Sequence, residues 1–556
     1  MDYSSSGPRI EPPGGNHPRA DRDLLYFPTM QAGLSIIDWS LVALFLLGVG
    51  AVGFRASGNQ SSTRDYFLGG RSIPWWAASL SIIATETSAV TFIGIPAASF
   101  SGDWTLLQLF TGFAIGRIFL ALVFVKAFYK REYITVYGLL AERFGERTRL
   151  LSALLFLAGR VVGSAVRLYA GCLAVRIALG TDSIETVIIA LGLFGAAFTL
   201  KGGIKAVVWT DVILGITLLA GCLVSCAWIL ASLPTDAGSI AAVLEGLPEK
   251  LSLIHLDTSL SDAGGLIAGL LGGMVLTLAT HGTDQDIAQR MLTCRDARGG
   301  RLSVLGSAVL IVPLIALFLA LGTLLWAWHK TGAAGYMAPI DNNELFPLFI
   351  VTDLPPGLAG LVMAGLLAAA LSSFTSVLNA LSATTVADIY RPFAERRGDH
   401  SDAHYMKISR AATLLWTVLL IGLAIAFVGS QDNIVNLALK VLTYFYGGLL
   451  GAFLVAILTN RGSGPSVMAG MLTSVPIVLL LQLRQFTDHH ETAPGLLQGW
   501  LKNLGPGTHA TLLWVPDIAW PWWIILGTLT SFIIGCLGKP REPSAAGSYS
   551  SEAEAG

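Results

Sequence analysis

The sequence predicts an all-α, polytopic membrane protein. Hydrophobic residues make up 53% of the 556 residues and charged residues only 13%, a balance that is typical of membrane proteins. Apolar stretches long enough to cross a bilayer core of about 30 Å recur along the chain. Lys and Arg gather in alternate connecting segments, as they do on the cytoplasmic side of membranes.

About thirteen apolar stretches are predicted to cross the membrane as helices, and together they form one transmembrane domain over residues 35–538. Residues 184–200 form the shortest stretch. The predicted spans are 35–54, 74–98, 104–129, 150–179, 184–200, 207–233, 266–283, 302–328, 357–387, 408–428, 434–458, 465–483 and 520–537.

The basic residues predict the orientation. With the N-terminus outside, roughly two thirds of the 35 Lys and Arg residues fall in inner connecting segments and roughly one fifth in outer segments. An odd number of spans then places the C-terminus in the cytoplasm. The polar stretches 1–33 and 539–556 are expected to be disordered tails. The short loops and the lack of a targeting peptide favour a bacterial inner membrane.

Several other classes of function find no support in the sequence. The net charge of −1 does not indicate a nucleic-acid partner, and no obligate protein partner is evident. The five cysteines include no CxxC pair, so neither a disulfide framework nor a zinc site is expected. Neither an HExxH nor a GxSxG motif occurs. We therefore do not expect an enzyme.

The stretch 363–390 combines small apolar residues with a cluster of hydroxyl groups. Ser372, Ser373, Thr375 and Ser376 lie within five residues of each other, and hydroxyls inside the membrane need partners. Each hydroxyl could bond a carbonyl one turn back along the helix. Alternatively, the hydroxyls could face a cavity and bind a small hard cation, which prefers oxygen ligands.

Two predicted spans carry signs of a break near their middle. In 74–98 the polar run Ala84–Ser88 is followed by Gly94 and Pro96, and in 266–283 two adjacent glycines precede Thr280 and His281. Unwound carbonyls at such breaks can bind ions, and two broken spans five apart in order suggest an inverted repeat with its site at the breaks. For His281, hydrogen-bonded packing is favoured over a proton relay.

Charged residues inside the spans are costly and usually face a cavity or a partner. Arg160, Ser164 and Arg167 share one helix face, and two cations there suit an anionic group such as a substrate carboxylate. The alternative is internal pairing with Glu86 or Asp211. The remaining basic residues within spans could be ion-pair partners, helix-end charges or cavity-lining groups; they are Arg117, Arg176 and Lys440.

Several motifs extend from the second predicted span to the ninth. They are DYFLGGR at 65–71, PWW at 74–76, FIG at 92–94, AVVWTDVI at 206–213, DQDIAQR at 284–290 and SSFTSVLNALSATTVADIY at 372–390. In these motifs the chain resembles the sodium:solute symporters, the family of the sodium–glucose, sodium–proline and sodium–sialic acid cotransporters. The arrangement of spans extends the likeness over nearly the whole chain.

The resemblance implies a LeuT-type core of two inverted repeats, at about 74–233 and 266–458, with one helix before it and two after. It also implies Na+ as the coupling ion. The residues implied for the main sodium site are the carbonyls of Ala84, Thr87 and Ala369 and the hydroxyls of Ser372 and Ser373. Asp211, Thr375 and Ser376 stand at the positions of a possible second sodium site.

The sequence departs from the sugar-transporting members of this family. The residues at several sugar-binding positions differ from theirs: Thr91, Phe110, Thr277, Thr280 and Leu439. Thr280 stands where the aromatic inner gate is expected, and Glu86 replaces an uncharged polar residue. A carboxylate-bearing or zwitterionic solute is therefore favoured. The expected solute-binding set is Glu86, Thr91, Arg160, Arg167, Thr277, Thr280 and Lys440.

The predicted function is sodium-coupled symport that imports a small polar organic solute, such as a carboxylate, an amino acid or a sugar-like compound. The expected mechanism is alternating access, in which sodium binding favours one state of the bundle. Two alternatives have the same fold. One is a proton-coupled symporter with Glu86 or Asp211 as the proton carrier, and the other is a solute sensor that has lost transport.

Overall fold

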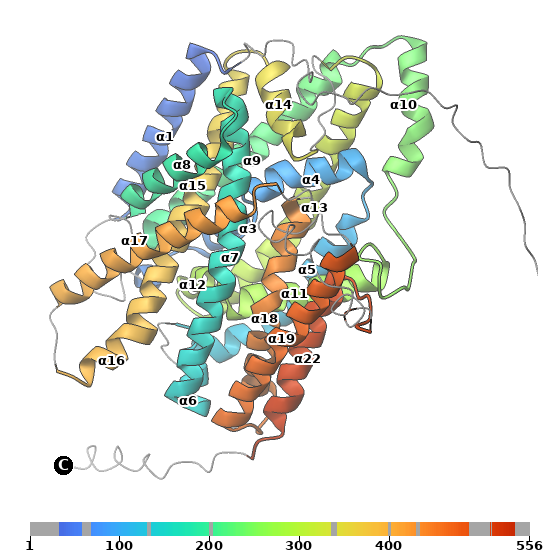
Figure 1. The fold of residues 1–556 in the computed structure, drawn as a ribbon. Coiled ribbons are helices and arrows are strands. Elements are labelled where there is room, and N and C mark those ends of the chain that lie inside the picture. Colours follow the sequence, from blue (N-terminus) through green and yellow to red (C-terminus); the bar gives the residue numbers. More distant parts are fainter. Residues whose placement is uncertain are drawn as a thin grey trace, which may run out of the picture.

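The computed structural model is a bundle of long helices that run roughly between the same two ends of the molecule (Figure 1). It describes residues 33–57, 68–130, 135–199, 204–334, 342–398, 402–429, 434–488, 512 and 514–539. Every regular element in these ranges is helical. Apart from Gly33 and Lys539, the two predicted tails lie outside the described residues. The predicted all-α class is thus confirmed.

In the described part of the chain, ten helices are long and apolar enough to cross a membrane. Each falls on a predicted span, which confirms a multi-pass membrane protein, although the total of thirteen stays a prediction. They are α1 (Ile36–Ser57), α5 (Leu106–Tyr129), α7 (Glu146–Leu179), α9 (Ile204–Ser232), α11 (Leu266–Thr283), α13 (Ala297–Lys330), α15 (Leu358–Thr384), α17 (Asp402–Ala426), α18 (Ile434–Leu458) and α19 (Gly464–Asp488).

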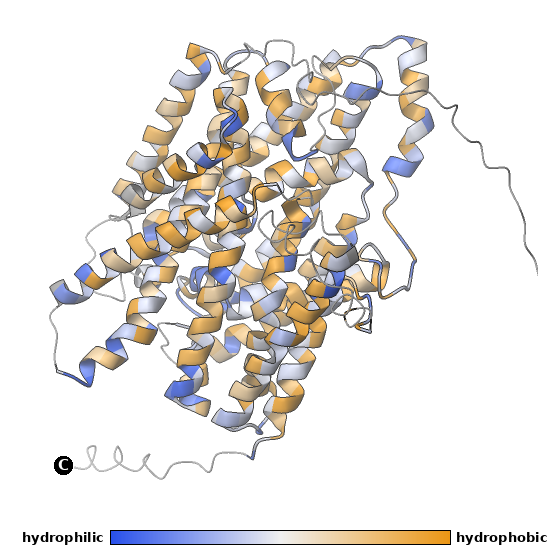
Figure 2. Cartoon of the chain, in the orientation of Figure 1, coloured by the Kyte–Doolittle hydropathy of each residue, from blue (hydrophilic) through white to orange (hydrophobic). Residues whose placement is uncertain are grey.

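The remaining predicted spans are a bent pair of helices and two shorter helices. The bent pair, α3 (Trp75–Glu86) and α4 (Ala89–Ser101), forms an eleventh span if it is counted as one. The helices α8 (Ile184–Thr199) and α22 (Trp520–Cys536) are apolar but shorter. Figure 2 shows hydrophobic residues along most of the helix lengths and hydrophilic residues at helix ends and in the interior, as a bilayer environment requires.

Helices α3 and α4 meet at an angle of 62°. In a continuous helix the amide of Ser88 would donate to the carbonyl of Ala84. It donates instead to the carbonyl of Glu86, at 3.0 Å, so the Ala84 carbonyl loses its helical partner. The break predicted for this span is therefore confirmed, and it frees a backbone oxygen inside the bundle.

The second break lies later than the sequence suggested. Helix α11 stays regular through both of its adjacent glycines and ends at Thr283, and α12 (Gln285–Leu292) follows after the extended residue Asp284. The glycines serve helix packing instead, because a Cβ on Gly273 would lie 2.1 Å from the carbonyl oxygen of Leu109 in α5. The residues expected at the break are thus helical, and Asp284 is the interruption.

Short helices cover both ends of the bundle (Figure 1). Helices α10 (Ala237–Lys250) and α14 (Leu345–Thr352), with η2 (Asn342–Glu344), lie at one end and belong to two of the predicted outer loops. The opposite end carries α6 (Gly138–Phe144), the π-helix η3 (Thr385–Tyr390) and α16 (Arg391–Glu395). A further short helix, η1 (Gly69–Arg71), precedes α3.

Candidate functional site

A small cavity lies where the end of α3 meets α9, α12 and α15. Its lining residues are Ala84, Thr85, Asp211, Leu214, Arg290, Ala369, Ser372, Ser373 and Ser376. This set includes all but one of the residues implied for the main sodium site, and two of the three implied for a second site. Within the described residues, Thr87 and Thr375 do not line the cavity.

The cavity is rich in oxygen atoms. The Ala84 carbonyl has lost its helical partner, and Ser372 donates its hydroxyl to Asp211 Oδ1 at 3.0 Å. Thr375 instead donates its hydroxyl to the Ser372 carbonyl at 3.1 Å. For this residue the structure shows the alternative in which the hydroxyl bonds the backbone of its own helix. Carbonyl, hydroxyl and carboxylate oxygens around one point suit a small hard cation.

A buried ion-pair network extends from this cavity along α12. Arg290 forms ion pairs with Asp211 at 3.1 Å and with Asp286 at 2.9 Å. Asp286 also pairs with Arg160, which in turn lies 2.8 Å from Asp284. All five side chains are at most 4% exposed. Such groups are stable inside a protein only when they are paired and hydrogen-bonded.

Most of this network is not predicted by the sequence. Arg290 falls in a predicted inner connecting segment, but its side chain is 1% exposed inside the bundle. The sequence offers Glu86 or Asp211 as partners for Arg160, whose partners are Asp284 and Asp286. One signal was present: Asp286 and Arg290 stand four residues apart on a short charged helix, as intrahelical ion pairs do.

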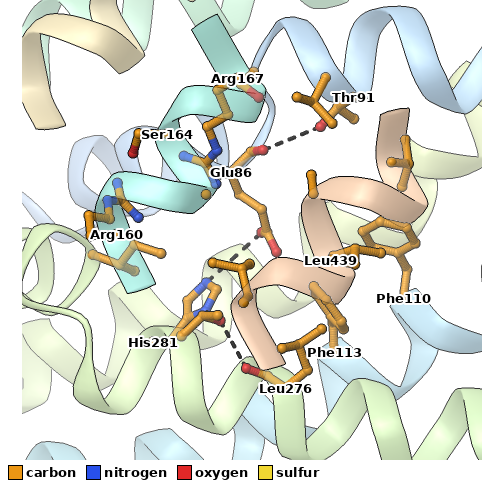
Figure 3. A pocket seen from close by; sticks show the side chains of 18 of the residues that line it. Glu86, Thr91, Phe110, Phe113, Arg160, Ser164, Arg167, Leu276, His281 and Leu439 are labelled. Atoms are coloured by element: carbon orange, nitrogen blue, oxygen red, sulfur yellow. Dashed lines mark hydrogen bonds and ion pairs between the residues drawn. The ribbon is translucent and has the colours of Figure 1, made fainter. Parts of the chain in front are cut away.

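A larger pocket lies on the other side of the helix break. Figure 3 shows Arg160, Ser164 and Arg167 of α7 on one side of it and Phe110, Phe113 and Leu439 on the other. The predicted common face of α7 therefore faces a cavity. The full lining is Glu86, Ser88, Val90, Thr91, Ile95, Phe110, Phe113, Arg160, Gly163, Ser164, Arg167, Leu276, Thr280, His281, Ile287, Val435, Ala438, Leu439 and Leu442.

The expected solute-binding residues are only partly brought together. Glu86, Thr91, Arg160, Arg167 and Thr280 line the pocket. Among the described residues, Thr277 and Lys440 do not line it. The hydroxyl of Thr277 lies 3.3 Å from Nδ1 of His281, a residue that does line the pocket.

The charged side chains around the pocket differ in whether they already have an ion-pair partner. Glu86 forms an ion pair with Arg117, which is fully buried and also donates to the Ser307 carbonyl at 2.9 Å. Arg160 is held by two aspartates. By contrast, no carboxylate of the described residues lies within ion-pair distance of Arg167, whose polar contact is a 3.4 Å bond to the Thr85 carbonyl. Arg167 is thus the cation that remains available to a ligand.

Three further polar groups of the pocket are buried and make no hydrogen bond within the described part of the chain. They are Ser88 Oγ, Ser164 Oγ and His281 Nε2, and the last lies 3.9 Å from Glu86. An unpaired polar group in a low-dielectric interior is costly unless something binds it. These groups, which are not in the solute-binding set expected from the sequence, leave the pocket suited to a polar ligand.

Broken helices around a buried cavity lined with oxygen atoms, within a bundle of apolar helices, are typical of a multi-pass membrane transporter of the LeuT type. The sequence model of the sodium:solute symporter family matches residues 66–474. The chain belongs to this family. It is a sodium-coupled symporter of a small solute, with Na+ as the coupling ion, and not an enzyme.

The comparisons also identify individual relatives. The chain is 28% identical to the sodium/sialic acid symporter SiaT of Proteus mirabilis, over 80% of this chain and 89% of the relative. It is 27% identical to the sodium/glucose cotransporter of Vibrio parahaemolyticus, over 82% and 86% of the two chains. The solved outward-open structure of a Na+-coupled sialic acid symporter matches with a TM-score of 0.76 and 23% identity, covering 92% of this chain and 100% of that chain. This last likeness confirms the fold.

Proposed function

We propose that this symporter imports a small carboxylate-bearing or zwitterionic solute together with Na+ by alternating access. The observation that carries the proposal is the position of Arg167. Its guanidinium lines a pocket beside the helix break and has no carboxylate partner among the described residues. A guanidinium binds carboxylates strongly, because its planar donors match both oxygens.

The sodium site of the proposal consists of Ala84, Thr87, Ala369, Ser372 and Ser373. It is supported by the shared cavity that contains four of these residues and by the Ala84 carbonyl that the break releases. Thr87 lies outside that cavity, so its carbonyl would join the site only after a local rearrangement of the break. Such rearrangement fits a site that must open and close during transport.

The solute site of the proposal combines Arg167 with the three unsatisfied polar groups of the pocket and with Glu86. The Glu86 side chain is 13% exposed, so its carboxylate can accept a hydrogen bond from an ammonium or hydroxyl group of the solute. The ion pair with Arg117 balances the charge of Glu86 when no solute is bound. The apolar wall formed by Phe110, Phe113 and Leu439 suits the carbon skeleton of the solute. The relatives that are sodium/sialic acid symporters have an acid as their named solute.

The proposed orientation places the N-terminus outside and the C-terminus in the cytoplasm of a bacterial inner membrane. It is supported by the distribution of Lys and Arg in the sequence and by the helices at the ends of the bundle. Helices α10 and α14, from predicted outer loops, share one end, and α6 and α16, from predicted inner segments, share the other (Figure 1).

Uptake into proteoliposomes tests this proposal. Radiolabelled solutes are compared under an inward Na+ gradient and under an equal K+ gradient; the set includes a monocarboxylate, a sialic acid, a neutral amino acid and glucose. We expect Na+-driven uptake of a carboxylate-bearing solute. Na+-driven uptake of glucose alone would contradict the carboxylate assignment.

A further inference from the structure

We propose that Glu86 and His281 form a subsite for an ammonium group, so that the solute of this symporter is a short zwitterionic amino acid. The inference rests on the proposed function, in which Arg167 binds the solute carboxylate, and it adds the second charged group of the solute. Glu86 and His281 both line the solute pocket, and His281 Nε2 lies 3.9 Å from Glu86 Oε2. Figure 3 shows these two side chains directed toward each other.

The imidazole of His281 is neutral in this environment. Its side chain is 3% exposed, and the buried guanidinium of Arg117 already balances the charge of Glu86 through the same carboxylate oxygen that His281 faces. A proton added to the ring would place a second, uncompensated cation beside that guanidinium in a low-dielectric interior. Only one of the two ring nitrogens therefore carries a hydrogen.

The neighbours of the ring decide which nitrogen carries that hydrogen. Thr280 donates its only hydroxyl hydrogen to the Leu276 carbonyl at 3.0 Å, so its oxygen presents a lone pair to His281 Nδ1, which lies 3.0 Å away. Two lone pairs at that distance repel, so we assign the hydrogen to Nδ1. The other nitrogen, Nε2, is then a hydrogen-bond acceptor.

A solute ammonium fits between the two acceptors that face each other. His281 Nε2 and Glu86 Oε2 cannot bond one another, and Nε2 is buried without a hydrogen-bond partner in the described ranges. Because the two atoms are 3.9 Å apart, one nitrogen can lie about 2.9 Å from both. An ammonium has a hydrogen for each acceptor. A hydroxyl has only one hydrogen and would leave the other acceptor unpaired.

A zwitterion suits this subsite better than other cations do. Na+ is a hard cation that prefers oxygen ligands, whereas an imidazole nitrogen suits softer transition metals. An amine without a carboxylate would add a net positive charge next to Arg117. A zwitterion carries its own carboxylate and therefore adds no net charge to the buried pocket.

The rest of the pocket suits the carboxylate end of such a solute. Ser164 Oγ and Ser88 Oγ line it with Arg167 and make no hydrogen bond within the described part of the chain. Their hydroxyls can donate to a carboxylate that Arg167 binds. The pocket has a volume of about 60 Å³, which is room for about five water-sized groups. The ammonium and the carboxylate therefore belong to one short molecule.

Binding of matched acids to the purified full chain at saturating NaCl tests this inference. Thermal-stability titrations compare alanine with lactate and propionate, and β-alanine with 3-hydroxypropionate and propionate, because the members of each series differ only in the amino, hydroxyl or hydrogen substituent. In at least one series we expect the amino acid to bind at least about tenfold more tightly than the other two, since both of its additional hydrogen bonds are charge-assisted.

The outcomes separate this inference from the proposed function. Binding of lactate, 3-hydroxypropionate or propionate as tight as that of the matching amino acid would overturn the ammonium subsite and leave the carboxylate assignment intact. Binding of none of these acids, together with Na+-driven uptake of a larger carboxylate, would also overturn the inference. No Na+-driven uptake of any carboxylate-bearing solute would overturn the proposed function itself.

The variant His281→Phe tests the subsite directly, because it keeps a ring of similar size and removes the Nε2 acceptor. We expect the ratio of amino-acid affinity to propionate affinity to fall about fivefold. A structural defect would lower both affinities and leave their ratio unchanged, and that result would overturn the role of His281. The matched control is His329→Phe, which alters a histidine outside the lining of the pocket and should keep the wild-type ratio.

Discussion

The cavity proposed for Na+ and the pocket proposed for the solute lie on opposite sides of the same helix break, yet their chemistry is opposite. The cavity gathers hydroxyl, carbonyl and carboxylate oxygens, and the network beside it has one aspartate more than it has arginines. The pocket presents one guanidinium without a carboxylate partner in the described residues, and an apolar wall. Residues 84 and 85 line the first, and residues 86 and 88 the second.

This difference shows how one break can serve two ligands. Unwinding at Thr87 leaves the Ala84 carbonyl without its helical partner beside the cavity, and Glu86 and Ser88 lie in the lining of the pocket. The ion pairs from Arg160 to Asp286 and from Asp286 to Arg290 join the two regions. A change in the ligand of one region therefore acts on charges that also face the other, which is the physical basis expected for coupling.

The largest effect is expected at Arg167. Substitution by Gln removes the cation that faces the pocket, and the loss of one partner from a buried charge pair costs about 2 kcal/mol or more, or at least about thirtyfold in affinity. Solute affinity is measured by competition or uptake, and Na+ affinity should stay unchanged. Arg176→Gln is the matched control, because Arg176 stands on the same helix but pairs with Glu344 away from the pocket. Equal losses in both variants would contradict the solute site.

Ser373→Ala should weaken Na+ binding and spare solute binding at saturating Na+. Removal of one oxygen ligand of an ion costs about 1.5 kcal/mol, which corresponds to about a tenfold rise in the Na+ concentration at half-maximal uptake. Thr375→Val removes a neighbouring hydroxyl that does not line the cavity, and we expect less than a twofold change. Unchanged sodium dependence in Ser373→Ala would count against the cavity as the sodium site.

His281→Phe should affect the pocket alone. It removes the unsatisfied Nε2, a neutral hydrogen-bonding group worth about 1 kcal/mol, so solute affinity should fall about fivefold. Na+ affinity should not change. The control is His329→Phe, which alters a histidine near the end of α13 that does not line the pocket. A lower Na+ affinity in His281→Phe, measured without solute, would contradict the assignment of His281 to the pocket alone.

The smallest effect is expected at Lys440, which the sequence placed in the solute site. The structure does not include it in the lining of the pocket, so Lys440→Gln should change solute affinity less than about twofold. A loss comparable to that of Arg167→Gln in uptake assays would show that Lys440 reaches the solute in another conformation of the bundle.

Local features of the sequence were sufficient to predict the helices and the first break. The length of the apolar stretches predicts the spans, because only a long apolar helix can cross the bilayer core. The polar run at 84–88 indicates the break between α3 and α4, and the hydroxyl cluster in α15 indicates the cavity. The spacing of Arg160, Ser164 and Arg167 gives the face that lines the pocket.

Features that depend on contacts between distant segments were not predictable in the same way. The partners of Arg160 lie more than a hundred residues away, on or next to α12, and no local pattern encodes that contact. The adjacent glycines of α11 give the same sequence pattern whether they break the helix or allow it to pack closely against another helix. Only the position of Leu109 decides between the two.

The most direct test of the account is the thermal stability of the purified protein over a panel of solutes, in NaCl and in KCl at equal ionic strength. Binding to the folded state raises the apparent stability by mass action. We predict a shift with a carboxylate-bearing solute that appears only with Na+ and is absent in Arg167→Gln. A shift with the same solute that is equal in NaCl and KCl, or that persists in Arg167→Gln, would contradict the account.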